Sequence, residues 1–86
     1  MKIKKDLIKR QVAGDTILVP VGQSIYQSNG LFVLNEVGAF LWDLLPEAES
    51  EEDLCKNVLE AYEVEENIAA ADVRDFLEML RKLDII

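Results

Sequence analysis

The sequence predicts an α+β fold in which a small antiparallel three-stranded sheet is followed by three helices, in a winged-helix-like arrangement. Two observations support this prediction. Apolar positions alternate or form short β-branched runs through the first 34 residues, and from residue 35 they recur with the helical period of 3.6. Strands in a run followed by helices in a run favour α+β over an alternating parallel fold. A length of 86 residues allows one domain at most.

The first two strands are predicted to form a hairpin. Residues 7–12 alternate loosely, as a solvent-facing strand does, and residues 16–21 are β-branched and nearly all apolar. Between them, Gly14 tolerates a positive φ and Asp15 can bond its local backbone, which suits a tight turn. Pro20 cannot donate to a ladder, so the second strand is an edge there or ends there.

A third strand is predicted directly before the first helix. Residues 25–34 have an extended pattern that is interrupted at the turn-type triplet of residues 28–30. The strand core is residues 31–34. Because side chains alternate, Leu31 and Val33 are expected on one face and Phe32 and Leu34 on the other, and one pair must face the core.

Three helices follow, and each carries a start or stop signal. Asn35 is a favourable N-cap for the first helix, and Pro46 ends it. Residues 50–53 approach a capping box for the second, and the third runs from about residue 66 to residue 82. The residues expected to face inward are Val37, Phe40, Leu41, Leu44 and Leu45, then Leu54, Val58, Leu59 and Tyr62, then Ala69, Val73, Phe76, Leu77, Leu80 and Leu83.

Charge is distributed unevenly along the chain. Residues 1–34 carry five basic and two acidic side chains, and residues 35–86 carry four basic and fifteen acidic ones, which gives the total of −8. This charge disfavours nucleic acid and anionic membranes, and it makes a basic protein or peptide the easier partner. No apolar run approaches a membrane span and no signal peptide is recognisable, so a cytoplasmic location is expected.

The chain lacks the residues that most enzymes need. It contains no histidine, and its one cysteine, Cys55, can build neither an internal disulfide nor a zinc or iron–sulfur site. No phosphate-binding loop is present, and the carboxylates lie on predicted helix faces and caps. We therefore predict a protein that is not an enzyme and uses no cofactor or metal.

Ordered motifs cover nearly the whole chain. They are the sequences of residues 16–22 and 30–42, Glu52-Asp53-Leu54, Tyr62-Glu63-Val64, and residues 71–77 together with the remainder of the chain. This ordered set resembles the coenzyme PQQ synthesis protein D (PqqD-like) family, also called the RiPP recognition element. Two departures are visible at helix ends. The glycine that is common before the second helix is absent from residues 46–49, and Asp84 stands where the family often has glycine.

The resemblance implies one non-catalytic peptide-recognition domain over residues 1–86. Such domains capture the leader segment of a ribosomally made precursor peptide and present it to a modifying enzyme, often of the radical S-adenosylmethionine (SAM) class. The leader adds as a strand to the edge of the third strand, beside the third helix. The implied partners are the precursor peptide and that enzyme, with no nucleic acid and no membrane.

These expectations select candidate peptide-binding residues. Strand addition needs an exposed edge, and an apolar groove beside it would take side chains of the peptide. Arg74 could grip a leader carboxylate. Asp72, Asp75 and Glu78 are either solvated surface or match the charge of a leader. The predicted edge is Leu31, Phe32, Val33 and Leu34, and the predicted opposite wall is Val73, Phe76, Leu77 and Leu80.

Several alternatives stay open at this point. The third-helix stripe is also what an ordinary core looks like, Trp42 is either semi-buried packing or an interface anchor, and Cys55 is interpreted as a small buried hydrophobe. The basic run of residues 2–10 is a solvated arm, or it meets an acidic leader or the enzyme. A winged-helix DNA-binding regulator and a scaffold that binds only a partner enzyme are the competing functions. An exposed strand edge would also permit a homodimer.

Overall fold

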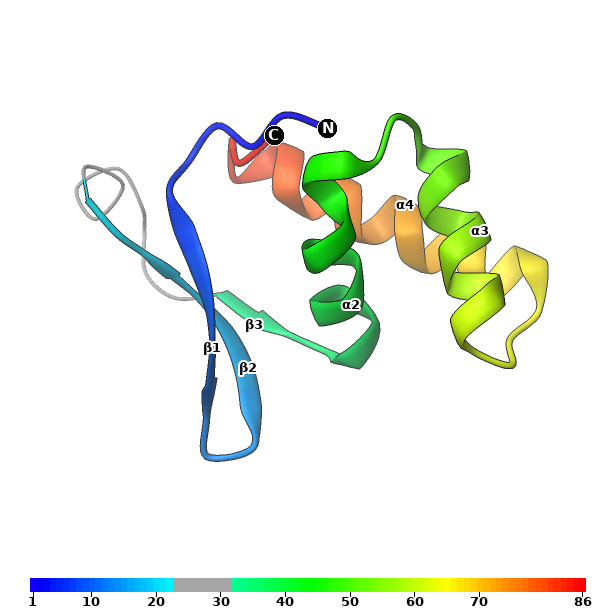
Figure 1. The fold of residues 1–86 in the computed structure, drawn as a ribbon, viewed down its shortest axis with the longest axis horizontal. Helices are drawn as coiled ribbons and strands as arrows, with labels where there is room; N and C mark the ends of the chain where they lie inside the picture. Colours follow the sequence, from blue (N-terminus) through cyan, green and yellow to red (C-terminus); the bar gives the residue numbers. More distant parts are fainter. Residues whose placement is uncertain (23–31) are drawn as a thin grey trace.

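The computed structural model describes residues 1–22 and 32–86 (Figure 1). The described chain forms one antiparallel sheet of order β1-β2-β3, followed by three α-helices, which confirms the predicted α+β fold. The predictions for residues 25–31, Leu31 among them, lie outside the described residues. The elements are β1 (Leu7–Val12), β2 (Asp15–Pro20), β3 (Phe32–Leu34), α2 (Glu36–Leu44), the 3-10 turn η1 (Leu45–Glu47), α3 (Glu51–Ala61) and α4 (Glu66–Lys82).

The β1–β2 hairpin is closed by a two-residue turn. Val12 pairs with Asp15 across Ala13 and Gly14, whose φ angles are +51° and +87°. Positive φ at both central residues is the signature of a type I′ turn, whose twist matches that of the strands. A tight turn containing Gly14 is therefore confirmed, but the prediction placed it over residues 13–16, whereas its centre is Ala13-Gly14 and Asp15 already begins β2. The two flanking residues form a hydrogen-bonded pair.

Hydrogen-bonded pairs alternate along this hairpin away from the turn. Asp6 and Val21 continue this pattern just beyond the strands, where the Val21 N–H donates to the Asp6 carbonyl at 2.9 Å. Pro20 lies opposite Leu7, at a position that is not hydrogen-bonded to β1, so its missing N–H costs the hairpin no bond. It follows that the even-numbered residues of β2 direct their backbone groups away from β1, toward β3.

β3 passes into α2 through one capping residue (Figure 1). Asn35 keeps an extended backbone, and its Oδ1 accepts a hydrogen bond from the Gly38 N–H at 2.7 Å. A Cβ atom at Gly38 would lie 3.1 Å from that oxygen and 3.6 Å from the Cβ of Leu34. The absent side chain thus permits the strand end and the first helical turn to approach closely, and the predicted N-cap is confirmed.

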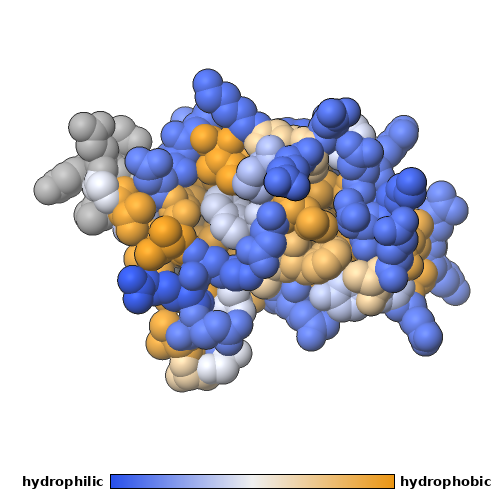
Figure 2. All heavy atoms as spheres, in the orientation of Figure 1, coloured by the Kyte–Doolittle hydropathy of each residue, from blue (hydrophilic) through white to orange (hydrophobic). Residues whose placement is uncertain are grey.

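A single hydrophobic cluster joins the sheet to the helices. Figure 2 shows hydrophobic residues gathered mainly over the sheet end of the molecule, while hydrophilic residues dominate the helical end of that face. Trp42 is 8% exposed and belongs to the core, which agrees with a packing role. The buried members are Leu18, Leu34, Leu41, Trp42, Leu45, Leu54, Val58, Ala69, Val73, Phe76, Leu77, Leu80 and Ile85.

Two side-chain contacts tie the elements together around this core. The rings of Phe40 on α2 and Tyr62 after α3 meet edge to face, with centroids 5.4 Å apart. The Lys9 ammonium on β1 pairs with the Asp43 carboxylate on α2.

The expectation that Leu59 faces inward is wrong, because its side chain is 37% exposed. Each residue advances about 100° around a helix, and Val58 occupies the inward position.

The helix ends largely follow the predicted signals. Pro46 ends the first helix, whose last turn tightens into η1. The Ser50 hydroxyl accepts from the Asp53 N–H at 3.2 Å, so α3 starts at the predicted cap. Arg81 and Lys82 occupy the last turn of α4, where the helix dipole favours cations.

The C-terminal end of α4 forms a Schellman motif. Asp84 takes a left-handed conformation with φ +58°, at the position where the sequence resemblance leads us to expect glycine. The Asp84 N–H donates to the Arg81 carbonyl at 3.0 Å, and the Ile85 N–H donates to the Leu80 carbonyl at 2.8 Å. The turn buries Ile85 completely, so this departure from glycine leaves the cap intact.

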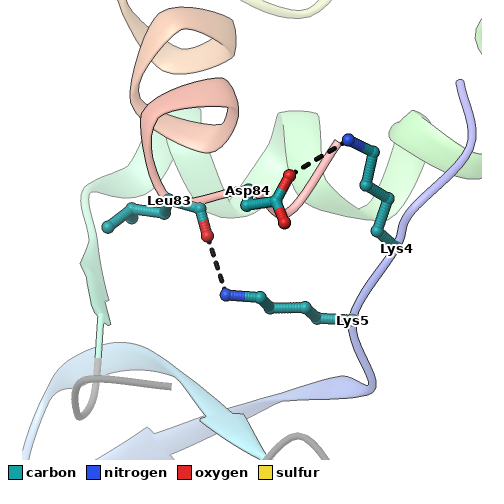
Figure 3. Close-up of polar contacts among 4 residues, drawn as sticks. All are labelled: Lys4, Lys5, Leu83 and Asp84. Carbon is teal, nitrogen blue, oxygen red and sulfur yellow. Dashed lines mark hydrogen bonds and ion pairs between the residues drawn. The ribbon is translucent and has the colours of Figure 1, made fainter. Parts of the chain in front are cut away.

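The N-terminal segment is fastened to this turn (Figure 3). The Lys4 ammonium pairs with Asp84 at 3.0 Å, and the Lys5 ammonium donates to the Leu83 carbonyl at 2.8 Å. The backbone N–H of Lys4 also donates to the Ile85 carbonyl at 2.6 Å. The Lys4 side chain is 55% exposed and so stays solvated, but Lys4 and Lys5 both contact oxygen acceptors of the C-terminal turn, so this part of residues 2–10 is not a free arm.

Replacing Asn35 tests the junction between β3 and α2. Asn35→Ala removes the acceptor for the Gly38 N–H, and we expect it to lower the free energy of unfolding by about 1 kcal/mol. Urea unfolding followed by circular dichroism measures this change. The control Asn35→Asp keeps the acceptor and is expected to stay near wild type. Equal stability of the Ala and Asp variants would contradict the capping role.

Two substitutions of Asp84 isolate its left-handed backbone. Asp84→Ala and Asp84→Gly both remove the carboxylate that pairs with Lys4, but only glycine adopts φ +58° without a steric cost. We therefore expect the Gly variant to be more stable than the Ala variant by about 1 kcal/mol. Thermal and urea unfolding provide the comparison, and an Ala variant as stable as the Gly variant would argue against the Schellman geometry.

The Lys4–Asp84 pair predicts a specific pH dependence. The hydrogen bond from Lys4 and its positive charge hold the pKa of Asp84 below its usual value. A lowered folded-state pKa stabilises the fold above the unfolded pKa of about 3.9, and that contribution is lost as the pH falls through the folded-state pKa. Lys4→Gln should therefore be less stable than wild type at neutral pH. This difference should vanish in strong acid, as urea unfolding across the pH range will measure.

Candidate functional site

A groove lies where β3, the start of α2 and one side of α4 come together. Its volume is about 230 Å³, below the roughly 300–1,000 Å³ of typical small-molecule pockets. The groove therefore suits the side chains of an extended segment better than a compact ligand. Its lining residues are Val33, Leu34, Asn35, Val37, Gly38, Leu41, Asp72, Asp75, Phe76 and Met79.

The Asn35 cap builds the near wall of this groove. It fixes the turn from β3 into α2, so that Val37 and Gly38 follow the strand end directly. Gly38 lines the groove, and the buried Leu34 and Leu41 form its apolar base. The groove thus depends on the same contact that starts the helix.

The far wall of the groove is one face of α4. Asp72, Asp75, Phe76 and Met79 are spaced i, i+3, i+4 and i+7, so they lie along one side of the helix. Phe76 is also part of the core, whereas Asp72 and Asp75 are exposed. This wall is therefore apolar at its base and acidic at its rim.

β3 has an open edge beside the groove within the described part of the chain. Thr16 pairs with Leu34 and Leu18 with Phe32, and the register of β2 makes both of these hydrogen-bonded pairs. Val33 lies between them, so its N–H and C=O point away from β2. Its side chain is 65% exposed, the largest value among the exposed large hydrophobic residues of the described chain.

The eight apolar residues predicted to bind peptide fall into three groups. Val33, Leu34 and Phe76 line the groove. Val73, Leu77 and Leu80 are 0% exposed, so they support α4 from below and do not form its groove-facing side. Phe32 is half-buried and packs against the core, and Leu31 lies outside the described residues.

Arg74 faces a different cavity, between α3 and α4. That cavity has a volume of about 510 Å³ and is larger than the groove, but no strand edge borders it. Cys55 also lines it, and burial followed by the charge of Glu51 raises the pKa of its thiol, which stays protonated at neutral pH. Arg74 is therefore not brought together with β3.

Sequence reasoning did not select the acidic rim or Met79 as binding residues. It treats Asp72 and Asp75 only as surface or as charges that match a leader. The sequence signal for these residues is their i, i+3, i+4, i+7 spacing from Asp72, which places them on a helix face next to the buried stripe that contains Val73. That signal is easily missed, because a polar face beside an apolar stripe is what any surface helix shows.

Two further properties concern the described residues alone. Within residues 1–22 and 32–86, none of the helices combines the length and apolar character needed to cross a membrane. In the same part of the chain, no three His, Cys, Asp or Glu side chains are grouped to hold a metal ion.

Comparisons with known proteins agree with this architecture. No curated protein matches the chain. Among solved structures, the chain is similar to one described as "TbiB1 in Complex with the TbiA(beta) Leader Peptide", with a TM-score of 0.73 and 26% sequence identity over 99% of this chain and 93% of that chain. The family model for coenzyme PQQ synthesis protein D (PqqD) matches residues 16–86. The match confirms the sequence resemblance, and the chain therefore belongs to the coenzyme PQQ synthesis protein D family.

Proposed function

We propose that residues 1–86 act as one non-catalytic domain that binds the leader segment of a ribosomally made precursor peptide and presents it to a modifying enzyme. The observation that carries the proposal is the open edge of β3 beside the groove on α4. The similar solved structure, a complex of TbiB1 with a leader peptide, supports it. A radical SAM partner enzyme and a cytoplasmic location belong to the same proposal.

Strand addition to β3 uses backbone groups that are already in place. An incoming strand bonds the N–H and C=O of Val33, and these bonds demand no particular peptide sequence. Each such bond contributes about 0.5–1.5 kcal/mol net. Micromolar binding needs about 8 kcal/mol, so the short edge alone does not provide enough affinity.

Side chains in the groove supply the remaining affinity. Burying one leucine-sized side chain contributes about 1.5–3 kcal/mol. Alternate residues of an added strand point to the same side, so every second peptide residue faces the base formed by Leu34, Leu41 and Phe76. The fully buried residues beneath α4 keep this base rigid, which lowers the entropic cost of binding.

The charge of the groove opposes a DNA-binding function. A recognition helix needs Arg or Lys toward phosphates and bases, whereas α4 presents Asp72 and Asp75 at the groove. Among the cations of α4, Arg74 faces the cavity toward α3, and neither Arg81 nor Lys82 lines the groove. No observation favours the regulator over the peptide-binding module.

A proline at Val33 tests strand addition directly. Proline is tolerated on a strand edge whose N–H points away from the sheet, and Val33→Pro removes that donor while leaving the two bonded neighbours intact. We expect peptide affinity to fall by about tenfold or more. The probes are synthetic peptides that cover the short open reading frames neighbouring this protein's gene, measured by isothermal titration calorimetry.

The matched control is Val33→Thr, which keeps the N–H and the β-branched shape and should bind within about threefold of wild type. Amide shifts of 15N-labelled protein should concentrate on β3 and on α4 between Asp72 and Met79. Two results would count against the proposal. Either none of the neighbouring peptides binds the wild-type protein, or a peptide binds Val33→Pro as tightly as it binds wild type.

A further inference from the structure

The rim of the groove carries two carboxylates with no ion-pair partner in the described part of the chain. Asp72 and Asp75 line the groove from α4, and both side chains are exposed. The ion pairs of Lys4 with Asp84 and of Lys9 with Asp43 do not touch the rim. An occupant of the groove therefore meets negative charge that the described residues do not neutralise.

The cations of α4 lie outside this groove. Arg74 faces the cavity between α3 and α4. Lys82 lines an adjoining cavity, which it shares with Asp75 and Glu78. An anionic side chain that entered the groove would face two carboxylates, and the net charge of −8 would repel an acidic peptide during approach.

We propose that the groove selects peptides that place a lysine or arginine two residues from the apolar side chain that enters it. This inference rests on the proposed function and names its substrate class. Residues two apart on a strand point to the same side and lie about 7 Å apart, so an anchor on the base puts its neighbour at the rim. The aliphatic stem of that neighbour runs along Phe76 and Met79, and its cationic head reaches Asp72 and Asp75.

Selection from random peptides tests this pattern without knowledge of the natural precursor. Short random peptides displayed on phage are selected on the immobilised full chain at about 0.15 M salt, where weak long-range attraction is largely screened. We expect the wild-type pool to be enriched in Lys or Arg two residues from an aliphatic or aromatic residue. Selection on Asp72→Asn/Asp75→Asn should retain the apolar residue and lose the cation.

A matched control separates the rim from total charge. Glu52→Gln/Glu66→Gln also removes two negative charges, but from the cavity on the α3 side of α4 instead of from the rim. Changing the selected Lys or Arg of one peptide to Gln should weaken binding to wild type and to this control by about fivefold. The same change should have no effect on binding to Asp72→Asn/Asp75→Asn. Circular dichroism confirms that each variant is folded.

The outcomes distinguish this inference from the function on which it rests. Peptides whose binding is lost in Val33→Pro but which show no enrichment of Lys or Arg overturn the cation preference and leave the peptide-binding function standing. A lysine effect that persists on Asp72→Asn/Asp75→Asn also overturns it. If no selected peptide is sensitive to Val33→Pro, both the function and the preference fail.

Discussion

The hydrogen bond from the Gly38 N–H to the Asn35 side chain is the contact on which the rest of the site depends. It satisfies a backbone donor at the start of α2, and it fixes the angle at which the helix leaves β3. A Cβ atom at Gly38 would crowd that oxygen at 3.1 Å. The edge of β3, the start of α2 and the floor of the groove are therefore positioned together by the short turn at Asn35, in which the Gly38 N–H is hydrogen-bonded.

The buried residues of α4 and its groove-facing residues divide two tasks along one helix. Val73, Leu77 and Leu80 hold α4 against the core, while Asp72, Asp75 and Met79 face the groove. Asp72 and Met79 each come one residue before a buried residue, Val73 and Leu80, and one residue is about 100° of rotation around the helix. A domain of this size can therefore keep a rigid core directly beneath an open site, because the same helix supplies both surfaces.

Affinity and selectivity would come from different parts of this site. The backbone of Val33 offers bonds that any extended peptide can make, and the apolar base adds energy with little demand on sequence. The negative charge of Asp72 and Asp75 at the rim is different, because it favours a basic over an acidic peptide residue beside the apolar side chain that enters the groove. Two of the fifteen acidic residues of the helical half, Asp72 and Asp75, lie at the groove.

The sequence by itself determined the order of strands and helices, the Asn35 cap, the Ser50 cap and the buried stripe on α4, because each of these follows from local periodicity or from one capping side chain. It also carried the family assignment. Only the tertiary structure decided that Val73, Leu77 and Leu80 do not line the groove, that Asp72 and Asp75 border it, and that Arg74 faces away from β3. A helical pattern gives the apolar side of a helix, but which neighbouring face meets a strand edge depends on how the helix is rotated against the sheet. That rotation is fixed by packing between residues far apart in the chain.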